Sequence, residues 1–380
     1  MNFIAKTFHG LEEVLAKELE LLKASNITIG RRSVTFSGDK QLLYTANLWL
    51  RSALKIFVPI EKFNATREKQ LYQNAYDIKW ENYLKPDSTI AIDSTVYSDY
   101  FNHSHYVALK VKDAIVDRFR EIYGKRPSID TKKPDVRIQV HVAHHKVTIS
   151  LDSSGDSLHK RGYHFFKGPA PLNEVLAAGL VLLSGWDKKS NLLDPMCGSG
   201  TILTEATFCA YNIPACIHRK YFGFMGWKDY DEKLWEIILK EVETKQTPFE
   251  HQIIGSDISA ISIKAAKKNI EYAELANKIT LTQKAFEDQE VMESSTTIIT
   301  NPPYGEQIVL KDLNALYKSI GDTLKHKFTN GTAWILSSNK AALKNVGLRT
   351  SAKKMLFNGP LECKLHKYEM YSGSRKAKYD

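Results

Sequence analysis

Two consecutive prolines, Pro302 and Pro303, follow a short apolar run at residues 297–300. This β-branched run predicts a buried parallel strand. Neither proline has a backbone N–H for a strand ladder, so the strand must end and the chain must turn. The turn leaves Asn301 beside Tyr304. The Asn301 amide oxygen and the Pro302 carbonyl suit the two hydrogens of an exocyclic amine, and the tyrosine ring suits stacking on a flat base, although an ordinary proline turn fits the tetrapeptide equally well.

A glycine loop follows another short apolar strand, which ends at Asp194. The loop is Gly198-Ser199-Gly200, and a helix is predicted from Thr201 to about Tyr211. Glycines allow a ligand to approach the backbone, and a helix N-terminus offers free N–H groups. The stretch lacks the third glycine of the dinucleotide fingerprint and the lysine of a phosphate-binding loop. It predicts instead a site for S-adenosylmethionine (SAM), with these candidate residues: Asp194, Met196, Cys197, Gly198, Ser199, Gly200 and Thr201.

A third strand, at 253–257, ends in Asp257, which we expect to bind the donor's ribose hydroxyls, with Ile258 next to it. A ribose acid usually lies about 20 residues beyond the glycine loop, whereas Asp257 follows Gly200 by 57 residues (257 − 200). An insertion at 216–250 accounts for the difference. We expect its aromatic residues to pack against the domain rather than to contact a base.

Strands alternate with helices throughout this half of the chain, with further strands at 279–282 and 297–300. Such alternation predicts an α/β fold with a doubly wound parallel sheet, whose ligands bind at the carboxyl ends of the strands. Asp194, Asp257 and Asn301 each follow a strand end and therefore share one edge. That shared position favours a two-ligand site over a plain proline turn.

The composition of the 380 residues is that of a folded, multidomain chain, with 43% hydrophobic and 25% charged residues. No apolar run approaches the roughly 18–20 residues of a membrane span, and the N-terminus lacks the apolar stretch of a signal peptide. The four cysteines show no zinc-type spacing. We expect a reduced, cytoplasmic protein without a structural metal. The net charge of +10 favours a polyanion partner, with a solvated basic surface as the alternative.

Two small units are predicted before the α/β half. Residues 1–60 alternate short strands and helices in the manner of a ferredoxin-like α+β unit, and residues 61–155 add a basic helix at 105–123. A basic loop at 124–134 and a cluster of cations beside an aromatic residue at 158–164 suit phosphate contact and base stacking. Solvated charge, or a hinge between domains, is the alternative. The candidate RNA-binding residues are Lys110, Lys112, Arg118, Arg126, Lys132, Lys133, Lys160, Arg161 and Tyr163.

The motifs together resemble a known family. The glycine-loop and Asn-Pro-Pro-Tyr-Gly-Glu stretches look like those of class I SAM-dependent RNA methyltransferases. Further motifs narrow the resemblance to the THUMP-domain guanine-N2 methyltransferases of bacterial large-subunit ribosomal RNA, the RlmL type. The stretches that carry it are 110–119, 159–163, 170–172, 194–201, 301–306 and 358–363.

The resemblance implies a ferredoxin-like domain at 1–60, a THUMP domain at 61–155 and a Rossmann-like methyltransferase domain at 156–380. It implies methyl transfer from SAM to the N2 amine of a guanine in 23S ribosomal RNA, free or in a pre-50S particle, by a protein expected to be a monomer. Asn301, Pro302 and Tyr304 would be the catalytic residues. Some members carry a second methyltransferase domain, and we expect a single one here.

One position departs from the family pattern. Ala285 stands where the family often has an acid that contacts the donor's adenine amine, so the Phe286 backbone, Glu287 or Asp288 is expected to take that role. The expected chemistry is in-line transfer by positioning, without a general base. Three alternatives stay open: guanine N2 in transfer RNA, adenine N6, and a non-catalytic RNA-binding assembly factor.

Overall fold

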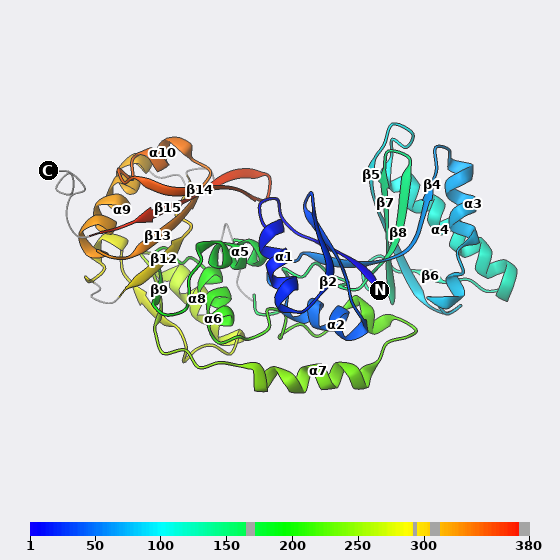
Figure 1. Ribbon diagram of the computed structural model, residues 1–380, viewed down its shortest axis with the longest axis horizontal. Coiled ribbons are helices and arrows are strands. Elements are labelled where there is room, and N and C mark those ends of the chain that lie inside the picture. Colours follow the sequence, from blue (N-terminus) through cyan, green and yellow to red (C-terminus); the bar gives the residue numbers. More distant parts are fainter. Residues whose placement is uncertain (165–171, 292–294, 305–311, 372–380) are drawn as a thin grey trace. The chain divides into compact units, whose positions relative to one another are not determined.

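The computed structural model describes residues 1–164, 172–291, 295–304 and 312–371 (Figure 1). The motif residues at 170–171 and 305–306, and the basic tail after Gly373, lie outside these ranges. The chain forms two compact units. The first contains residues 1–7, 16–158 and 219–241, and the second contains residues 8–15, 159–218 and 242–380.

The first unit is built on one eight-stranded sheet with the order β2-β3-β1-β4-β8-β7-β5-β6. Its strands are β1 (Asn2–Lys6), β2 (Ser25–Gly30), β3 (Ser33–Ser37), β4 (Lys55–Asn64), β5 (Thr89–Tyr97), β6 (Ser128–Ile129), β7 (Val136–Ala143) and β8 (Lys146–Asp152). The long β4 pairs antiparallel with β1 near its start and with β8 along its length. The two small units predicted at residues 1–60 and 61–155 therefore share a continuous sheet.

Four helices occur between these strands along the chain: α1 (Glu12–Leu21), which spans residues of both units, α2 (Lys40–Trp49), α3 (Glu68–Asp77) and α4 (Ser104–Tyr123). The helix α4 buries residues at helical spacing, among them Val111, Ile115 and Phe119, and packs against α3 and β5. In β7 every second residue is buried, as the alternation of its sequence predicts.

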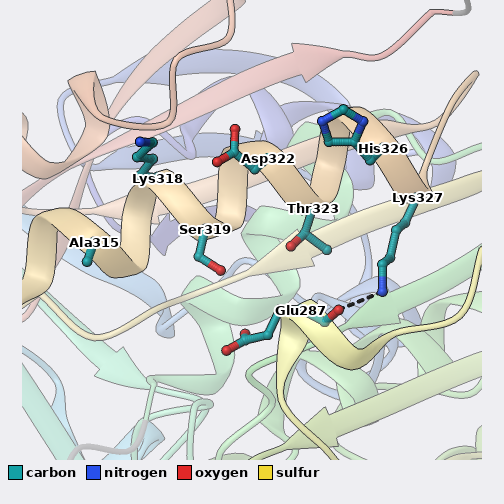
Figure 2. Close-up of a pocket in the computed structure, with 8 residues that line it drawn as sticks. All are labelled: Glu287, Ala315, Lys318, Ser319, Asp322, Thr323, His326 and Lys327. Atoms are coloured by element: carbon teal, nitrogen blue, oxygen red, sulfur yellow. Dashed lines mark hydrogen bonds between the residues drawn. The ribbon is translucent and has the colours of Figure 1, made fainter.

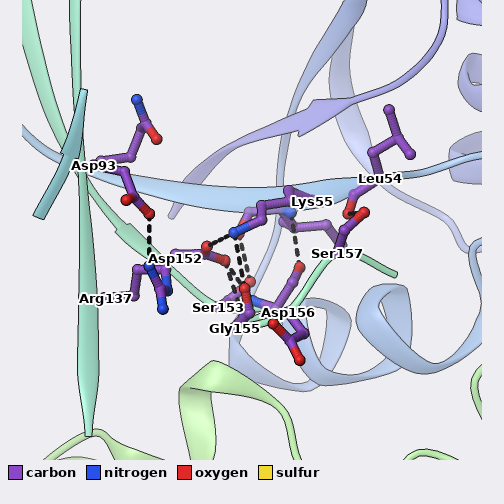
Figure 3. A network of polar contacts seen from close by, with 12 residues as sticks. Leu54, Lys55, Asp93, Arg137, Asp152, Ser153, Gly155, Asp156 and Ser157 are labelled. Atoms are coloured by element: carbon purple, nitrogen blue, oxygen red, sulfur yellow. Dashed lines mark hydrogen bonds and ion pairs between the residues drawn. The ribbon is translucent and has the colours of Figure 1, made fainter. Parts of the chain in front are cut away.

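A polar network anchors the sheet where β8 ends (Figure 3). The buried Asp152 forms an ion pair with Lys55, whose ammonium also donates to the Gly155 carbonyl oxygen at 2.8 Å. On neighbouring strands, Arg137 and Asp93 form an ion pair at 2.8 Å. The Lys55 contact satisfies the charge of Asp152, which burial would otherwise penalise, whereas the Asp93 side chain is half exposed.

The predicted insertion divides between the two units. It carries η2 (Gly223–Gly226) and α7 (Glu232–Lys245), and its residues 219–241 belong to the first unit. There Phe224 is buried and stacks on Tyr44, with ring centroids 4.1 Å apart. A Cβ at Gly223 would lie 2.3 Å from the Asp152 carbonyl oxygen, so only glycine permits this approach. Phe224 thus packs against the first unit, whereas Phe249, near the end of the insertion, packs against Trp186 and Tyr211 of the second unit, with ring centroids 5.5 and 5.8 Å apart.

The second unit contains a seven-stranded sheet with the order β11-β10-β9-β12-β13-β15-β14. Its strands are β9 (Asn191–Asp194), β10 (Ile253–Asp257), β11 (Thr280–Gln283), β12 (Thr296–Thr300), β13 (Thr332–Ser337), β14 (Thr350–Asn358) and β15 (Leu361–Glu369). The first five in the order are parallel, and β15 runs antiparallel between β13 and β14. The order reverses between β9 and β12, which is where doubly wound sheets bind ligands.

Helices connect these strands: α5 (Glu174–Ser184), α6 (Thr201–Ala210), α8 (Ala260–Tyr272), α9 (Leu313–Lys327) and α10 (Lys340–Lys344). A core of apolar side chains from β12, β13 and α9, including Ile298, Ile335 and Ile320, supports the sheet, and Leu193 of β9 and Ile254 of β10 extend this core across the switch point. All four cysteines are free thiols. None of the described helices is both long and apolar enough to span a bilayer.

Candidate active site

Three strand ends meet at the carboxyl edge of the second sheet, as the sequence predicts. Asp194 ends β9 and is paired in register with Gly255 of the neighbouring β10, two residues before Asp257. On the other side of β9, Leu193 is paired with Ile298 of β12, three residues before Asn301. The two acids and the amide therefore follow three adjacent strands, on both sides of the switch point.

Asp194 connects the glycine loop with the strand that leads to Asn301. Its Oδ1 accepts a 2.8 Å hydrogen bond from the Thr300 hydroxyl and a 3.3 Å bond from the Met196 backbone N–H. Burial, with a smaller contribution from the charge of Asp257, raises the pKa of Asp194 to about 7. This carboxyl group is a fixed part of the fold, held between β9 and β12.

Asp257 organises two loops through its two carboxylate oxygens. One oxygen accepts from the Gly198 N–H at 3.0 Å, and the other accepts from the Ser259 N–H at 2.9 Å. Each oxygen keeps a second lone pair, so the carboxylate can still accept hydroxyl hydrogens from a ligand. The adjacent Ile258 is 73% exposed and is available to cover a ligand.

The glycine loop has the backbone form that a close ligand approach requires. Gly198 and Gly200 have φ values of 53° and 81°, in the left-handed region that favours glycine. A Cβ on Gly198 would have no heavy atom within 4 Å among the described residues, so this face of the loop is open. A Cβ on Gly200 would lie 3.2 Å from that of Ala266, which allows α8 to pack closely. Burial raises the pKa of the Cys197 thiol well above its ordinary value, so this side chain remains protonated.

The Asn301–Tyr304 turn is held from two other elements. The Tyr317 hydroxyl of α9 bonds to the Pro303 carbonyl at 3.3 Å and to Ser337 of β13 at 2.7 Å. The Asn339 amide donates to the Tyr304 carbonyl at 3.4 Å. The sequence did not predict that Tyr317 and Asn339 support the turn. Asn339 could have been found, because it lies just beyond the carboxyl end of β13, as Asn301 lies just beyond that of β12.

The side chains of the turn contact each other. The Tyr304 hydroxyl donates to the Asn301 amide oxygen, the atom predicted to accept amine hydrogens. Burial raises the pKa of Tyr304 far above its ordinary value, so the hydroxyl stays protonated and remains a donor. In this conformation the amide oxygen is already engaged, and an incoming amine would have to replace the tyrosine hydroxyl.

The segment after β11 places Phe286 in the core. Its ring is buried, 5.9 Å from that of Phe328, so only its backbone can contact a ligand. Lys327 at the end of α9 donates to the Glu287 and Gln289 carbonyl oxygens at 2.6 and 2.8 Å. The Glu287 side chain lines an open groove of about 440 Å³ beside α9 (Figure 2). The adenine-contacting residue remains a prediction.

Two predicted RNA contacts, Arg161 and Tyr163, are wrong. Both side chains are buried, and both bond to Glu205 of α6: Arg161 Nε lies 3.2 Å and Tyr163 Oη 2.9 Å from Glu205 Oε1. A cation beside an aromatic residue in sequence does not distinguish a buried ion pair from an exposed one. The pair instead fixes the 159–164 segment on α6, while Lys160 is exposed.

The other predicted RNA contacts are at least partly exposed. Arg118 forms a two-pronged ion pair with Glu81, at 3.0 and 2.7 Å, which neutralises its charge. Lys112 lies 2.7 Å from Asp113, and Lys110 lies 5.3 Å from the centre of the Tyr106 ring. The exposed cations of the loop after α4 are Arg126, Lys132 and Lys133.

Family models match almost the whole chain. The RlmL ferredoxin-like domain matches residues 2–57, the THUMP domain matches 65–152, and the RMKL-like methyltransferase domain matches 161–367, more than half of the chain. The chain belongs to the RMKL-like methyltransferases. The resemblance inferred from the motifs, and the predicted fold class, are thereby confirmed.

Relatives of this RMKL-like methyltransferase agree with the assignment. A protein of Synechocystis sp., named as a candidate RNA methyltransferase, is 40% identical over 375 residues, covering 97% of both chains. The ribosomal RNA large subunit methyltransferase K/L of Syntrophotalea carbinolica is 36% identical over 97% of this chain, which spans 54% of that relative's length. A crystal structure of SMU.472, titled as a candidate methyltransferase complexed with SAH, superposes with a TM-score of 0.89 at 27% identity, covering 98% and 99% of the two chains.

These findings make the RMKL-like chain a SAM-dependent methyltransferase. The residues at the strand ends fit such a cofactor: Gly198 leaves an open face on the loop, and Asp257 retains free lone pairs next to it. No group of three or more His, Cys, Asp or Glu side chains within the described ranges is arranged to hold a metal ion.

Proposed function

We propose that this methyltransferase transfers a methyl group from SAM to the N2 amine of a guanine in 23S ribosomal RNA. The observation that carries the proposal is the convergence of Asp194, Asp257 and Asn301 after three adjacent strands. The name of the Syntrophotalea relative supports ribosomal RNA of the large subunit as the substrate, and this chain spans 54% of that relative's length.

On the donor side, the chain supplies a shaped loop and a carboxylate. When bound, SAM supplies an electrophilic methyl group. Asp257 would accept hydroxyl hydrogens from the ribose, and the proposal is supported by its two oxygens, each of which uses only one lone pair for the loops. Gly198 and Gly200 allow the backbone to approach the ligand, and Met196 and Cys197 complete the loop between Asp194 and these glycines.

On the acceptor side, Asn301 and Pro302 present two carbonyl oxygens. The two oxygens would accept both hydrogens of an exocyclic amine and so direct its lone pair toward the methyl group. The Tyr304 hydroxyl would leave Asn301 when the base enters, and the ring would stack on the base. A base in a paired region must first leave its stack. The step depends on orientation, which can supply much of the reduction in barrier.

We propose that the first unit binds the RNA, through its THUMP domain. The exposed cations of the 126–133 loop and the partly exposed Lys110 and Lys112 are the residues best placed to contact phosphates. The proposed partner is 23S ribosomal RNA, either free or in a pre-50S particle.

The test is mass analysis of nucleosides from ribosomal and transfer RNA, taken from cells with and without the gene. Loss of N2-methylguanosine from 23S RNA alone, with restoration by the wild-type gene, supports the proposal. Loss of N2-methylguanosine from transfer RNA would make transfer RNA the substrate. Loss of N6-methyladenosine would make the N6 amine of adenine the methyl acceptor. Unchanged nucleosides, together with no methyl transfer by the purified protein, would favour a non-catalytic RNA-binding protein.

A further inference from the structure

A chain of hydrogen bonds joins helix α5 to the glycine loop. Glu174, in the first turn of α5, lies 2.6 Å from His164 Nδ1. The other ring nitrogen of His164 lies 3.3 Å from the hydroxyl oxygen of Thr201, the first residue of α6. That hydroxyl lies 3.5 Å from the Ser199 hydroxyl, inside the loop. The connected groups all belong to the second unit.

The ionisation of Glu174 fixes the direction of the first bond. Burial raises the pKa of Glu174, but the His164 hydrogen bond and charge, with a smaller effect of His159, bring the pKa below its ordinary value. Glu174 is therefore a carboxylate and accepts the bond, so His164 Nδ1 carries a proton. Nε2, the other ring nitrogen, faces the Thr201 hydroxyl, which can accept a hydrogen bond from it or donate one to it.

The first turn of α6 follows a loop that Asp257 and Asn269 also hold, through the Gly198 N–H at 3.0 Å and the Ser199 carbonyl oxygen at 3.1 Å. Its N-cap residue is Gly200, which provides no side-chain hydrogen bond. The Thr201 side chain is buried, and a buried hydroxyl is costly unless it is bonded. The His164 bond therefore helps to fix the Thr201 side chain in the first turn of α6.

The histidine is not needed merely to fasten its segment to α6. Arg161 and Tyr163 already bind Glu205, four residues after Thr201 and on the same face of that helix. The His164 bond adds a second attachment at the end of the helix that adjoins the glycine loop. It constrains the loop from the side of α6, in addition to the bonds that Asp257 and Asn269 make with the loop backbone.

We propose that His164, oriented by Glu174, is a positioning residue for donor binding, which fixes the Thr201 side chain and with it the conformation of the 198–200 loop. The inference rests on the proposed placement of SAM at this loop. His164 does not touch the reacting atoms in this account. It acts by removing alternative loop conformations before the cofactor binds, which lowers the free energy of binding.

The experiment is isothermal titration calorimetry of the full chain with SAM, without RNA. We expect His164→Ala and Thr201→Val each to weaken SAM binding roughly 3- to 10-fold, the effect of one hydrogen bond. Thr201→Ser keeps the hydroxyl and should bind SAM like the wild type. The double variant should bind about as weakly as each single variant, because both remove the same bond.

Two controls separate positioning from stability and from the donor site. Tyr163→Phe removes a neighbouring bond to Glu205, so it should lower the melting temperature without changing the SAM affinity. Asp257→Ala tests the donor site directly and should weaken SAM binding. If His164→Ala does not fold, the comparison of Thr201→Val with Thr201→Ser still tests whether the Thr201 hydroxyl contributes to SAM affinity.

The outcomes that overturn the inference are distinct from a failure of the donor site. If Asp257→Ala weakens binding while His164→Ala and Thr201→Val do not, the positioning role is wrong and the donor site stands. Additive effects in the double variant, or a Thr201→Ser variant as weak as Thr201→Val, also contradict it. If neither Asp257→Ala nor His164→Ala changes the affinity, the donor lies elsewhere and both proposals fail.

Discussion

At the residue scale, Asn301 is the side chain on which the proposed transfer most depends. Replacing it with alanine removes one of the two oxygens that orient the amine, while the donor loop is unchanged. We expect Asn301→Ala to lower methyl transfer roughly 100-fold or more, as the loss of one preorganised polar contact does in other enzymes. Transfer of a labelled methyl group to RNA and calorimetry with SAM are the measurements. The exposed Asn277→Ala is the matched control, and full activity of Asn301→Ala would remove this residue from the mechanism.

The two parts of the Tyr304 side chain have separate roles, and two variants separate them. Its hydroxyl occupies the Asn301 amide oxygen, whereas its ring is proposed to stack on the base. Tyr304→Phe frees the oxygen and keeps the ring, so kcat should be retained or rise. Tyr304→Ala loses a stacking contact worth about 1–3 kcal/mol, so KM for RNA should rise. Equal losses in both variants, measured by steady-state kinetics, would contradict this division.

The buried Asp194 makes stability depend on pH. Its pKa is about 7 in the fold, against an ordinary value of 3.8. Between these two pKa values, Asp194 is ionised in the unfolded chain but still protonated in the folded protein. The contribution of Asp194 to stability therefore falls as the pH rises from about 4 to 7, and then levels off. The fall is at most about 4 kcal/mol, since one pKa unit corresponds to about 1.4 kcal/mol.

The Asp194→Asn variant tests this dependence. The amide oxygen can still accept from Thr300 and Met196, but it cannot ionise. The free energy of unfolding of each ligand-free protein is measured by chemical denaturation at pH 5 and pH 8. The value for the variant minus the value for the wild type should be larger at pH 8 than at pH 5. An identical difference between the two proteins at both pH values would show that the Asp194 pKa is not raised.

At the scale of elements, the insertion is expected to stabilise the first unit and not the donor site. Phe224 lies in the part of the sequence matched by the methyltransferase family model, yet its ring is buried against Tyr44 of the first unit. Phe224→Ala should therefore lower the free energy of unfolding by about 3–5 kcal/mol, with SAM affinity unchanged under folding conditions. A lowered SAM affinity in folded Phe224→Ala would contradict this assignment.

Regular periodicity made most elements of the second sheet predictable. The Asp194, Asp257 and Asn301 positions followed from short apolar runs with polar ends, because parallel strands place their carboxyl ends on one edge. Helix α9 was not predicted, although Tyr317, Ile320 and Leu324 have helical spacing and are buried. Its Tyr317 hydroxyl turned out to support the Asn301–Tyr304 turn.

Contacts between distant segments were beyond sequence reasoning. The burial of Arg161 depends on Glu205, 44 residues away, and no local pattern indicates that pairing. The same applies to the chain from Glu174 through His164 to Thr201, whose members are ordinary polar residues in sequence. Periodicity indicates which face of an element is buried, but not which polar groups meet there.

At the scale of the whole molecule, the N-terminal part behaves as one folded body. The predicted division at residue 60 falls inside β4, which pairs with strands of both the ferredoxin-like and the THUMP parts. The divisions at 60 and 155 remain predictions. A truncated protein that begins at residue 61 would lack residues 55–60, which form the first part of β4. We infer that RNA-binding experiments should keep both N-terminal parts together.

The net charge of +10 does not by itself show where RNA binds, and a charge-matched pair of variants can. Lys132→Ala with Lys133→Ala removes two exposed cations from the loop after α4. Lys188→Ala with Lys189→Ala removes two exposed cations next to the start of β9, opposite the site edge of the sheet. We expect the first pair to lower RNA affinity and the second to leave it near that of the wild type.

Salt dependence gives the sharper measurement for these variants. Each phosphate contact contributes about 0.7–0.9 to the slope of log K against log salt, since binding releases a condensed counterion. If Lys132 and Lys133 each contact a phosphate, their loss should reduce the magnitude of that slope by about 1.4–1.8. Equal changes in both double variants would mean that RNA affinity depends on the total charge of the protein. The loop after α4 would then not be a specific RNA-binding site.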